Sequence, residues 1–129
     1  MAENQKPALG TVGWLDLTVD DADGVRDFYA AVVGWRPEPL DMGGYSDYVM
    51  NSPETGEGAA GVCHQRGPNV GIPQVWLPYL IVADLDASMA ACRERGGEVV
   101  IGPRDAGGGA RFAIIRDPAG AHAAIFQNG

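Results

Sequence analysis

Four side chains in the sequence could transfer protons or hold a polar ligand, and all four stand in apolar, strand-like segments. Asp16 lies inside the pattern of residues 12–19, and three later segments carry His64, Tyr79 and His122. A carboxyl group, two imidazoles and a phenol form an acid–base or hydrogen-bonding set if one cavity collects them. In that case Asp16 and His122 are the candidate catalytic residues.

Each of these residues also has an ordinary structural explanation. A buried carboxylate is costly without a partner, and an arginine could neutralise Asp16. The arginines that come into question are Arg26, Arg111 and Arg116. His64 stands at the end of its strand beside polar residues, where exposure is the simpler expectation. A tyrosine such as Tyr79 is often part of a core, whereas the alanines around His122 leave room for a ligand.

Three large apolar side chains, Trp14, Met50 and Phe112, could wall a pocket beside those polar groups or belong to the core. The expected ligand-binding set is therefore Trp14, Asp16, Met50, His64, Tyr79, Phe112 and His122. We expect no metal ligand in this set.

Other catalytic motifs are missing from the sequence. Gly107-Gly108-Gly109 lacks the lysine of a phosphate-binding loop and predicts a mobile or tightly turning loop. Cys63 and His64 are neighbours on a strand, so their side chains point to opposite faces and form no nucleophile pair. Cys63 and Cys92 both lie in apolar segments, which favours buried thiols over a disulfide.

The elements that position these residues belong to a chain of 129 residues, the size of one ordinary domain. The hydrophobic fraction of 46% is enough for a core, and 19 glycines predict many turns between short elements. A formal net charge of −8 argues against nucleic acid and anionic membranes as partners. The polar first ten residues show no apolar signal segment, and no apolar run is long enough for a membrane helix. We expect a cytoplasmic protein.

Hydrophobic periodicity predicts the same order of elements twice. A strand over residues 12–19 precedes a helix with apolar residues at helical spacing, and Gly34 is placed to end that helix. The apolar positions are Val25, Phe28, Tyr29, Val32 and Val33. Three short strands follow, near residues 35–40, 45–50 and 59–65.

After a linker at residues 66–73 the order starts again. A strand over 74–82 precedes a helix that starts near Asp84 and ends at Gly96-Gly97, and short strands follow near residues 99–101, 110–115 and 121–127. Val19 and Val82 lie 63 residues apart, as do Gly34 and Gly97. Such a repeat indicates a duplicated module.

Three segments of this pattern resemble the vicinal oxygen chelate superfamily, which includes glyoxalase I, bleomycin-resistance proteins and extradiol dioxygenases. The segments are residues 13–35, 77–100 and 111–127. Phe28-Tyr29 before Gly34-Trp35, and Asp117-Pro118-x-Gly120 before the last strand, match local signatures of the superfamily.

The resemblance implies an α+β fold, in which two βαβββ modules form paired half-barrels around a cavity. We expect a single domain over residues 1–129, with modules at 10–65 and 74–129 and the linker between them. Members of the superfamily often pair, so the resemblance also implies a homodimer.

In the enzymes of the superfamily a divalent metal is held by residues on the first and last strands of each module. The corresponding positions here fall on Trp14, Val62, Leu77 and Ala124, none of which offers a lone pair to a metal. The resemblance therefore implies the fold without its usual metal, and we expect no cofactor. A displaced divalent metal held by Asp16, His64 and His122 is the less favoured alternative.

Three functions remain open at this point. The first is a protein that binds a small molecule in the cavity without a metal, similar to bleomycin-resistance proteins. The second is a glyoxalase-like lyase or isomerase that uses Asp16 and His122 as an acid–base pair, or a displaced metal. The third is a dimeric interaction module with a vestigial cavity. The sequence does not identify the ligand.

Overall fold

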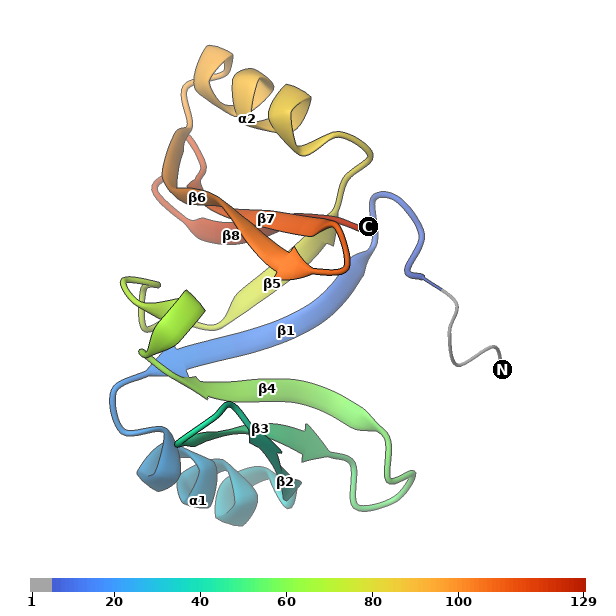
Figure 1. The fold of residues 1–129 in the computed structure, drawn as a ribbon, viewed down its shortest axis with the longest axis vertical. Coiled ribbons are helices and arrows are strands. Elements are labelled where there is room, and N and C mark those ends of the chain that lie inside the picture. Colours follow the sequence, from blue (N-terminus) through green and yellow to red (C-terminus); the bar gives the residue numbers. More distant parts are fainter. Residues whose placement is uncertain (1–5) are drawn as a thin grey trace. The chain divides into compact units, whose positions relative to one another are not determined.

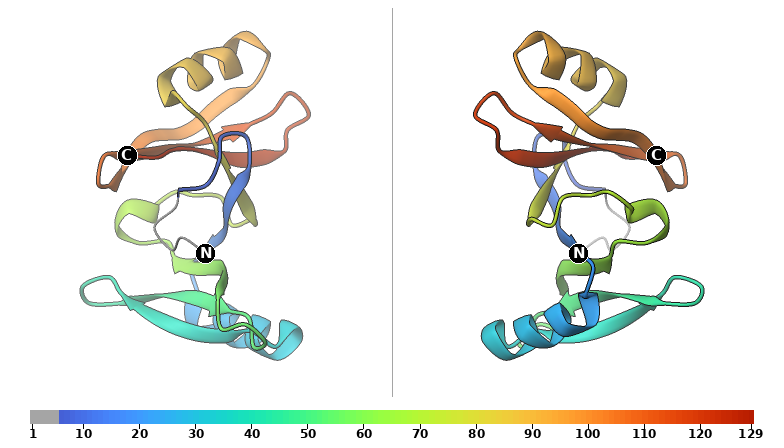
Figure 2. Two further views of the ribbon diagram at one scale, coloured as in Figure 1. Left: turned by 90° about the vertical axis from the view of Figure 1, so that its right-hand side faces the viewer. Right: turned by 90° about the vertical axis from the view of Figure 1, so that its left-hand side faces the viewer.

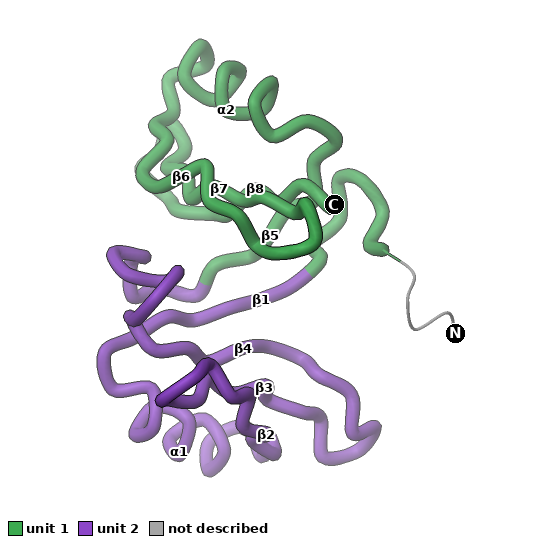
Figure 3. Tube along the Cα trace, in the orientation of Figure 1, with its two compact units in different colours: residues 1–13, 77–129 green, residues 14–76 purple. Residues whose placement is uncertain are grey.

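A computed structural model describes residues 6–129, which form eight strands, two α-helices and one short 3-10 turn (Figure 1). The chain divides into two compact units: unit 2 is residues 14–76, and unit 1 is residues 77–129 with the segment up to residue 13 (Figure 3). The order strand, helix and three strands occurs twice along the chain. The predicted α+β fold of two βαβββ modules is confirmed.

Unit 2 contains most of β1 (Val12–Val19), then α1 (Ala22–Val33), β2 (Arg36–Asp41), β3 (Ser46–Asn51) and β4 (Gly58–His64). Its sheet has the order β2-β3-β4-β1, with β1 parallel to β4 and the other pairs antiparallel. One face of this sheet packs on α1 in a core of Leu17, Val19, Ala22, Tyr48, Met50 and Val62. The sheet is open, and the predicted linker that follows it contains the 3-10 turn Gly67–Asn69.

Local signals explain where α1 begins and ends. The side chain of Asp21 accepts a hydrogen bond from the Gly24 N–H at 3.0 Å, which satisfies one of the free donors of the first turn. Gly34 ends the helix in the left-handed conformation, with φ 85°, as predicted. The apolar stripe is only partly covered, because Phe28 and Val32 are 56% and 64% exposed.

Unit 1 contains β5 (Leu77–Ile81), α2 (Leu85–Glu94), β6 (Glu98–Gly107), β7 (Ala110–Arg116) and β8 (His122–Gln127). Its sheet has the order β5-β8-β7-β6, with β5 parallel to β8 (Figures 1 and 2). The helix α2 packs on this sheet in a core of Leu85, Met89, Ala113 and Ile125.

The helix α2 ends before Gly96-Gly97, as predicted, and Gly96 takes the left-handed conformation there, with φ 89°. Gly97 is needed for close approach, because a Cβ there would lie 2.7 Å from the Cys92 Sγ. Strand β6 is longer than the strand predicted near residues 99–101 and runs on to Gly107, since register shifts against β7 absorb the irregular residues.

Side chains alternate across each sheet, which separates two faces of unit 2. Leu17 is paired with Val62 and faces α1, so Asp16 and its partner Gly61 face the other way. We call this second surface, which carries Trp14, Asp16, Gly61 and Cys63, the far face of unit 2. Among residues 6–129, neither helix is long and apolar enough to cross a membrane.

Candidate functional site

The centre of the far face of unit 2 is the carboxyl group of Asp16. The indole Nε1–H of Trp14 donates a hydrogen bond to Asp16 Oδ1 at 3.0 Å. The Cys63 thiol donates to Asp16 Oδ2 at 3.4 Å. Both donors are neutral groups, so the carboxyl group has hydrogen-bond partners but no counter-charge from them.

Gly61 of β4 makes room for this arrangement, and Gly58 lies beside the same indole. A Cβ at Gly61 would lie 2.0 Å from Asp16 Oδ1 and 3.2 Å from Trp14 Nε1. A Cβ at Gly58 would lie 3.4 Å from the far end of the Trp14 indole, at Cη2. The indole therefore lies along β4 where two successive contacts lack a side chain. A glycine inside a strand often marks such a close approach.

Burial dominates the electrostatics of Asp16. It raises the pKa of the carboxyl group from 3.8 to about 6, against the hydrogen bonds from Trp14 and Cys63, which lower it. The negative charge of Asp47 raises the pKa further. At neutral pH Asp16 is thus an ionised carboxylate held in a place that disfavours its charge.

The expectation that an arginine pairs with Asp16 is wrong for the three candidates. Arg26 lies against Asp23 and Asp27 on α1. In unit 1, the other two arginines form their ion pairs as Arg111–Asp86 and Arg116–Glu98. Within residues 6–129 we find no ion pair to Asp16.

The thiol of Cys63 is part of the same polar group. Burial raises its pKa first, and the nearby carboxylates of Asp16 and Asp47 raise it further. A thiol in this state is a poor nucleophile. Cys63 and Cys92 are both free, in agreement with the expectation of unpaired thiols.

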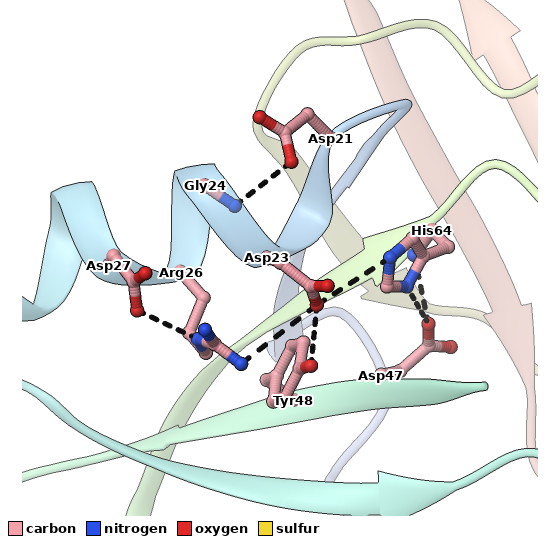
Figure 4. Close-up of polar contacts among 8 residues, drawn as sticks. All are labelled: Asp21, Asp23, Gly24, Arg26, Asp27, Asp47, Tyr48 and His64. Carbon is pink, nitrogen blue, oxygen red and sulfur yellow. Dashed lines mark hydrogen bonds and ion pairs between the residues drawn. The ribbon is translucent and has the colours of Figure 1, made fainter.

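His64 lies on the α1 side of the sheet, between two carboxylates (Figure 4). Its Nε2 is 3.7 Å from Asp23 Oδ1, and its Nδ1 is 3.6 Å from Asp47 Oδ1. The side chain is 14% exposed, so the expectation of an exposed histidine is wrong. Nδ1 itself is buried without a hydrogen-bond partner.

Neighbouring groups fix the two carboxylates around His64. Tyr48 donates a hydrogen bond of 2.5 Å to Asp23 Oδ1, which lowers the pKa of Asp23 and raises that of Tyr48 (Figure 4). Asp47 is buried and accepts a hydrogen bond of 2.8 Å from the His64 backbone N–H. His64 therefore links α1 to β3 and does not reach the far face.

The structure brings some of the predicted site residues together and separates others. Trp14 and Asp16 are in direct contact, whereas His64 is on the opposite face of the same sheet. Met50 is fully buried in the core against α1. The far-face residues Gly61 and Cys63 were not predicted. The signal for Gly61 was a lone glycine inside a strand pattern.

The other three predicted residues lie in unit 1, on the sheet face opposite α2. The ring of Tyr79 has its centroid 6.1 Å from that of Phe112 and 6.4 Å from that of Phe126. Tyr79 is paired with Ala124, which shares its face with His122. His122 is half-buried at the start of β8, where Arg116 is its pairing partner.

Comparison with known families identifies the class of protein. A family model described as the Glyoxalase/Bleomycin resistance protein/Dioxygenase superfamily matches residues 11–125. The chain belongs to this superfamily.

Two curated relatives match almost the whole chain. CFP32 of Mycobacterium tuberculosis (strain CDC 1551 / Oshkosh), provisionally named a glyoxylase, is 32% identical over 98% of this chain and 49% of its own length. The anthracycline biosynthesis protein DnrV of Streptomyces peucetius is 32% identical over 95% of this chain and 48% of its own length. The chain spans about half the length of the curated relatives it matches.

Solved structures with low sequence identity share the fold. A superfamily member from Vibrio splendidus 12B01 has a TM-score of 0.57 and 9% identity, over 89% of this chain and 97% of that one. Methylmalonyl-CoA epimerase from Streptomyces coelicolor, in complex with 2-nitronate-propionyl-CoA, has a TM-score of 0.52 and 19% identity, over 95% and 99%.

The superfamily often binds a divalent metal, and the residues present at its ligand positions do not fit one. Val62, Leu77 and Ala124 are apolar and at most 1% exposed. The Trp14 indole offers a hydrogen-bond donor, not a lone pair. In the described part of the chain, no three His, Cys, Asp or Glu side chains gather as a metal site would require.

Proposed function

We propose that this protein binds a small organic molecule on the far face of unit 2, at Trp14 and Asp16, without a metal. The observation that carries the proposal is the Asp16 carboxyl group: it is buried enough to raise its pKa to about 6, yet its hydrogen-bond donors are an indole and a thiol. An ionised group that destabilises the folded state is usually kept because it serves binding or catalysis.

The surroundings of Asp16 support a binding role. Trp14 offers a large aromatic surface next to the polar atoms of the carboxyl group, and such a combination orients a ligand while burying its apolar part. The relative DnrV is named for anthracycline biosynthesis, which is consistent with an aromatic small molecule as ligand. The apolar residues at the superfamily's metal positions favour binding without a metal.

A thermal-shift screen against a small-molecule library tests this proposal. The protein is screened with and without EDTA, beside Asp16→Asn and the control Asp20→Asn, whose residue is exposed after β1. We expect ligands that raise the melting temperature of the wild type and of Asp20→Asn with EDTA present, but act weakly on Asp16→Asn. Stabilisation that disappears with EDTA, or that ignores the Asp16 substitution, would contradict the proposal.

A second candidate function is acid–base catalysis of the lyase or isomerase type. It is favoured by one observation, because a carboxyl group with a pKa of about 6 can accept and return a proton near neutral pH. Ligands from the screen can be incubated with the protein in D₂O. Deuterium incorporation with the wild type, and its loss in Asp16→Asn, would show catalysis rather than binding alone.

The expected homodimer is also part of this proposal. The exposed apolar residues Phe28, Val32 and Val33 on α1 are the surface we would test first. Light scattering of the wild type and of Val32→Glu measures the mass of each protein in solution. A wild-type dimer that Val32→Glu dissociates would support a contact through α1. A dimer whose mass the substitution leaves unchanged would contradict this contact.

A further inference from the structure

We propose that the ligand carries a positively charged amine, which binds the Asp16 carboxylate and the ring of Trp14. The inference rests on the proposed function of the far face and adds the chemical class of the ligand. The inference follows from the aromatic ring of Trp14 in the site and from the neutral or negatively charged groups around the Asp16 carboxylate.

The carboxylate of Asp16 has donors on both oxygens, but within residues 6–129 it has no counter-charge. Trp14 donates to Oδ1 at 3.0 Å, and Cys63 lies 3.4 Å from Oδ2. The charged group that acts on Asp16 is Asp47, which has the same sign and disfavours a second negative charge. In the described residues, the arginines that could have served are paired with other carboxylates. A ligand cation would supply the charge that the fold leaves out.

Trp14 adds a second feature that suits a cation. Its Nε1 edge is used by Asp16, and the length of the indole lies along Gly58 and Gly61 of β4. The residue is only partly buried. A cation near both an aromatic face and a carboxylate gains from each, and the gain increases as water is excluded.

The same features select against other ligands. An anion would meet Asp16 and Asp47, and the net charge of −8 would repel it at longer range. A neutral ligand would leave the charge of Asp16 uncompensated. The site therefore discriminates by charge more than by shape.

Binding of an amine must be coupled to the proton of Asp16. Burial raises the pKa of the free carboxyl group to about 6, and a bound cation lowers it again. At a pH between the pKa of Asp16 in the free protein and its lower pKa in the complex, amine binding releases the Asp16 proton. The affinity for the amine therefore falls as the pH falls below 6. For a ligand that stays protonated, lowering the pH from about 7.5 to about 5 should weaken binding about tenfold, because about nine-tenths of Asp16 is then neutral.

Isothermal titration with three probes of one shape tests the inference: 2-naphthylmethylamine, 2-naphthalenemethanol and 2-naphthoate. We expect the amine to bind the wild type near pH 7.5 at least about tenfold more tightly than the alcohol, since a desolvated ion pair contributes more than a neutral hydrogen bond. The naphthoate should bind most weakly. The preference for the amine should survive in Asp20→Asn and disappear in Asp16→Asn.

The two proposals fail in different ways. Equal binding of amine and alcohol, with no change between the two pH values, would overturn the amine inference and leave metal-free binding at Asp16 standing. The same holds if the library screen yields only neutral or anionic ligands that depend on Asp16. If amine binding persists unchanged in Asp16→Asn, both the inference and the proposed site are wrong.

Discussion

Replacing Asp16 by asparagine should make the protein more stable near neutral pH. Burial raises the pKa of Asp16 in the folded protein from 3.8 to about 6. At 1.36 kcal/mol for each pH unit, keeping this group ionised costs the folded state about 3 kcal/mol above pH 7. Asparagine is similar in shape, can still accept the Trp14 hydrogen bond, and removes the charge.

The sign of the pH dependence follows from the raised pKa. The folded protein holds the Asp16 proton more tightly than the unfolded chain, so this group destabilises the fold fully above pH 6. The cost shrinks as the pH falls from 6 towards 3.8. The advantage of Asp16→Asn should therefore be about 3 kcal/mol near pH 7.5 and about 1 kcal/mol near pH 4.5.

Urea unfolding of the wild type, Asp16→Asn and Asp20→Asn at both pH values measures this effect. At each pH, the difference in the free energy of unfolding between wild type and variant removes the effects of the other titrating groups. The exposed Asp20 serves as the matched control, and its substitution should change the free energy of unfolding by less than about 0.5 kcal/mol. An Asp16→Asn protein that is less stable than the wild type near pH 7.5, or equally shifted at both pH values, would refute the reasoning.

Three further substitutions or probes address the neighbouring contacts. Gly61→Ala should destabilise unit 2 by about 1–3 kcal/mol and weaken ligand binding, because its Cβ would lie 2.0 Å from Asp16 Oδ1. Urea unfolding measures the stability and isothermal titration measures the binding. An unchanged free energy of unfolding and an unchanged affinity would contradict the close approach. Tyr48→Phe should lower the free energy of unfolding by about 1 kcal/mol, through loss of the hydrogen bond to Asp23, and should leave ligand binding intact. Burial and nearby carboxylates raise the pKa of Cys63, so iodoacetamide should modify this thiol in urea but not in the folded protein. Peptide mass spectrometry measures the modification. Rapid modification of Cys63 in the folded protein would show a reactive thiolate and contradict the raised pKa.

The sequence predicted elements whose signals are local. Asp21 and Gly34 mark the ends of α1 through caps that depend on a few neighbouring residues. The repeat along the chain predicted the second module in the same way. Gly96 and Gly97 show the limit of this approach, because the sequence alone does not tell which of the two glycines takes the left-handed conformation; in the structure it is Gly96.

The candidate site could be predicted only in part, because it depends on pairing between distant strands. Trp14 and Asp16 share a strand, so alternation alone places them on one face. The assignment of His64 failed because the register of β1 against β4 decides which residues of β4 face Asp16. That register pairs Asp16 with Gly61 and leaves His64 on the α1 side.

Fluorine NMR of the protein labelled with 5-fluorotryptophan tests the central claim most directly, since it reports on Trp14 in metal-free protein. The chain has 3 tryptophans. Trp35 and Trp76 pack together on Tyr29 within unit 2 and serve as internal controls. We predict that 2-naphthylmethylamine, added in EDTA, moves the Trp14 resonance alone and that Asp16→Asn abolishes the change. A Trp14 resonance that stays fixed, or moves only after a divalent metal is added, would contradict the account.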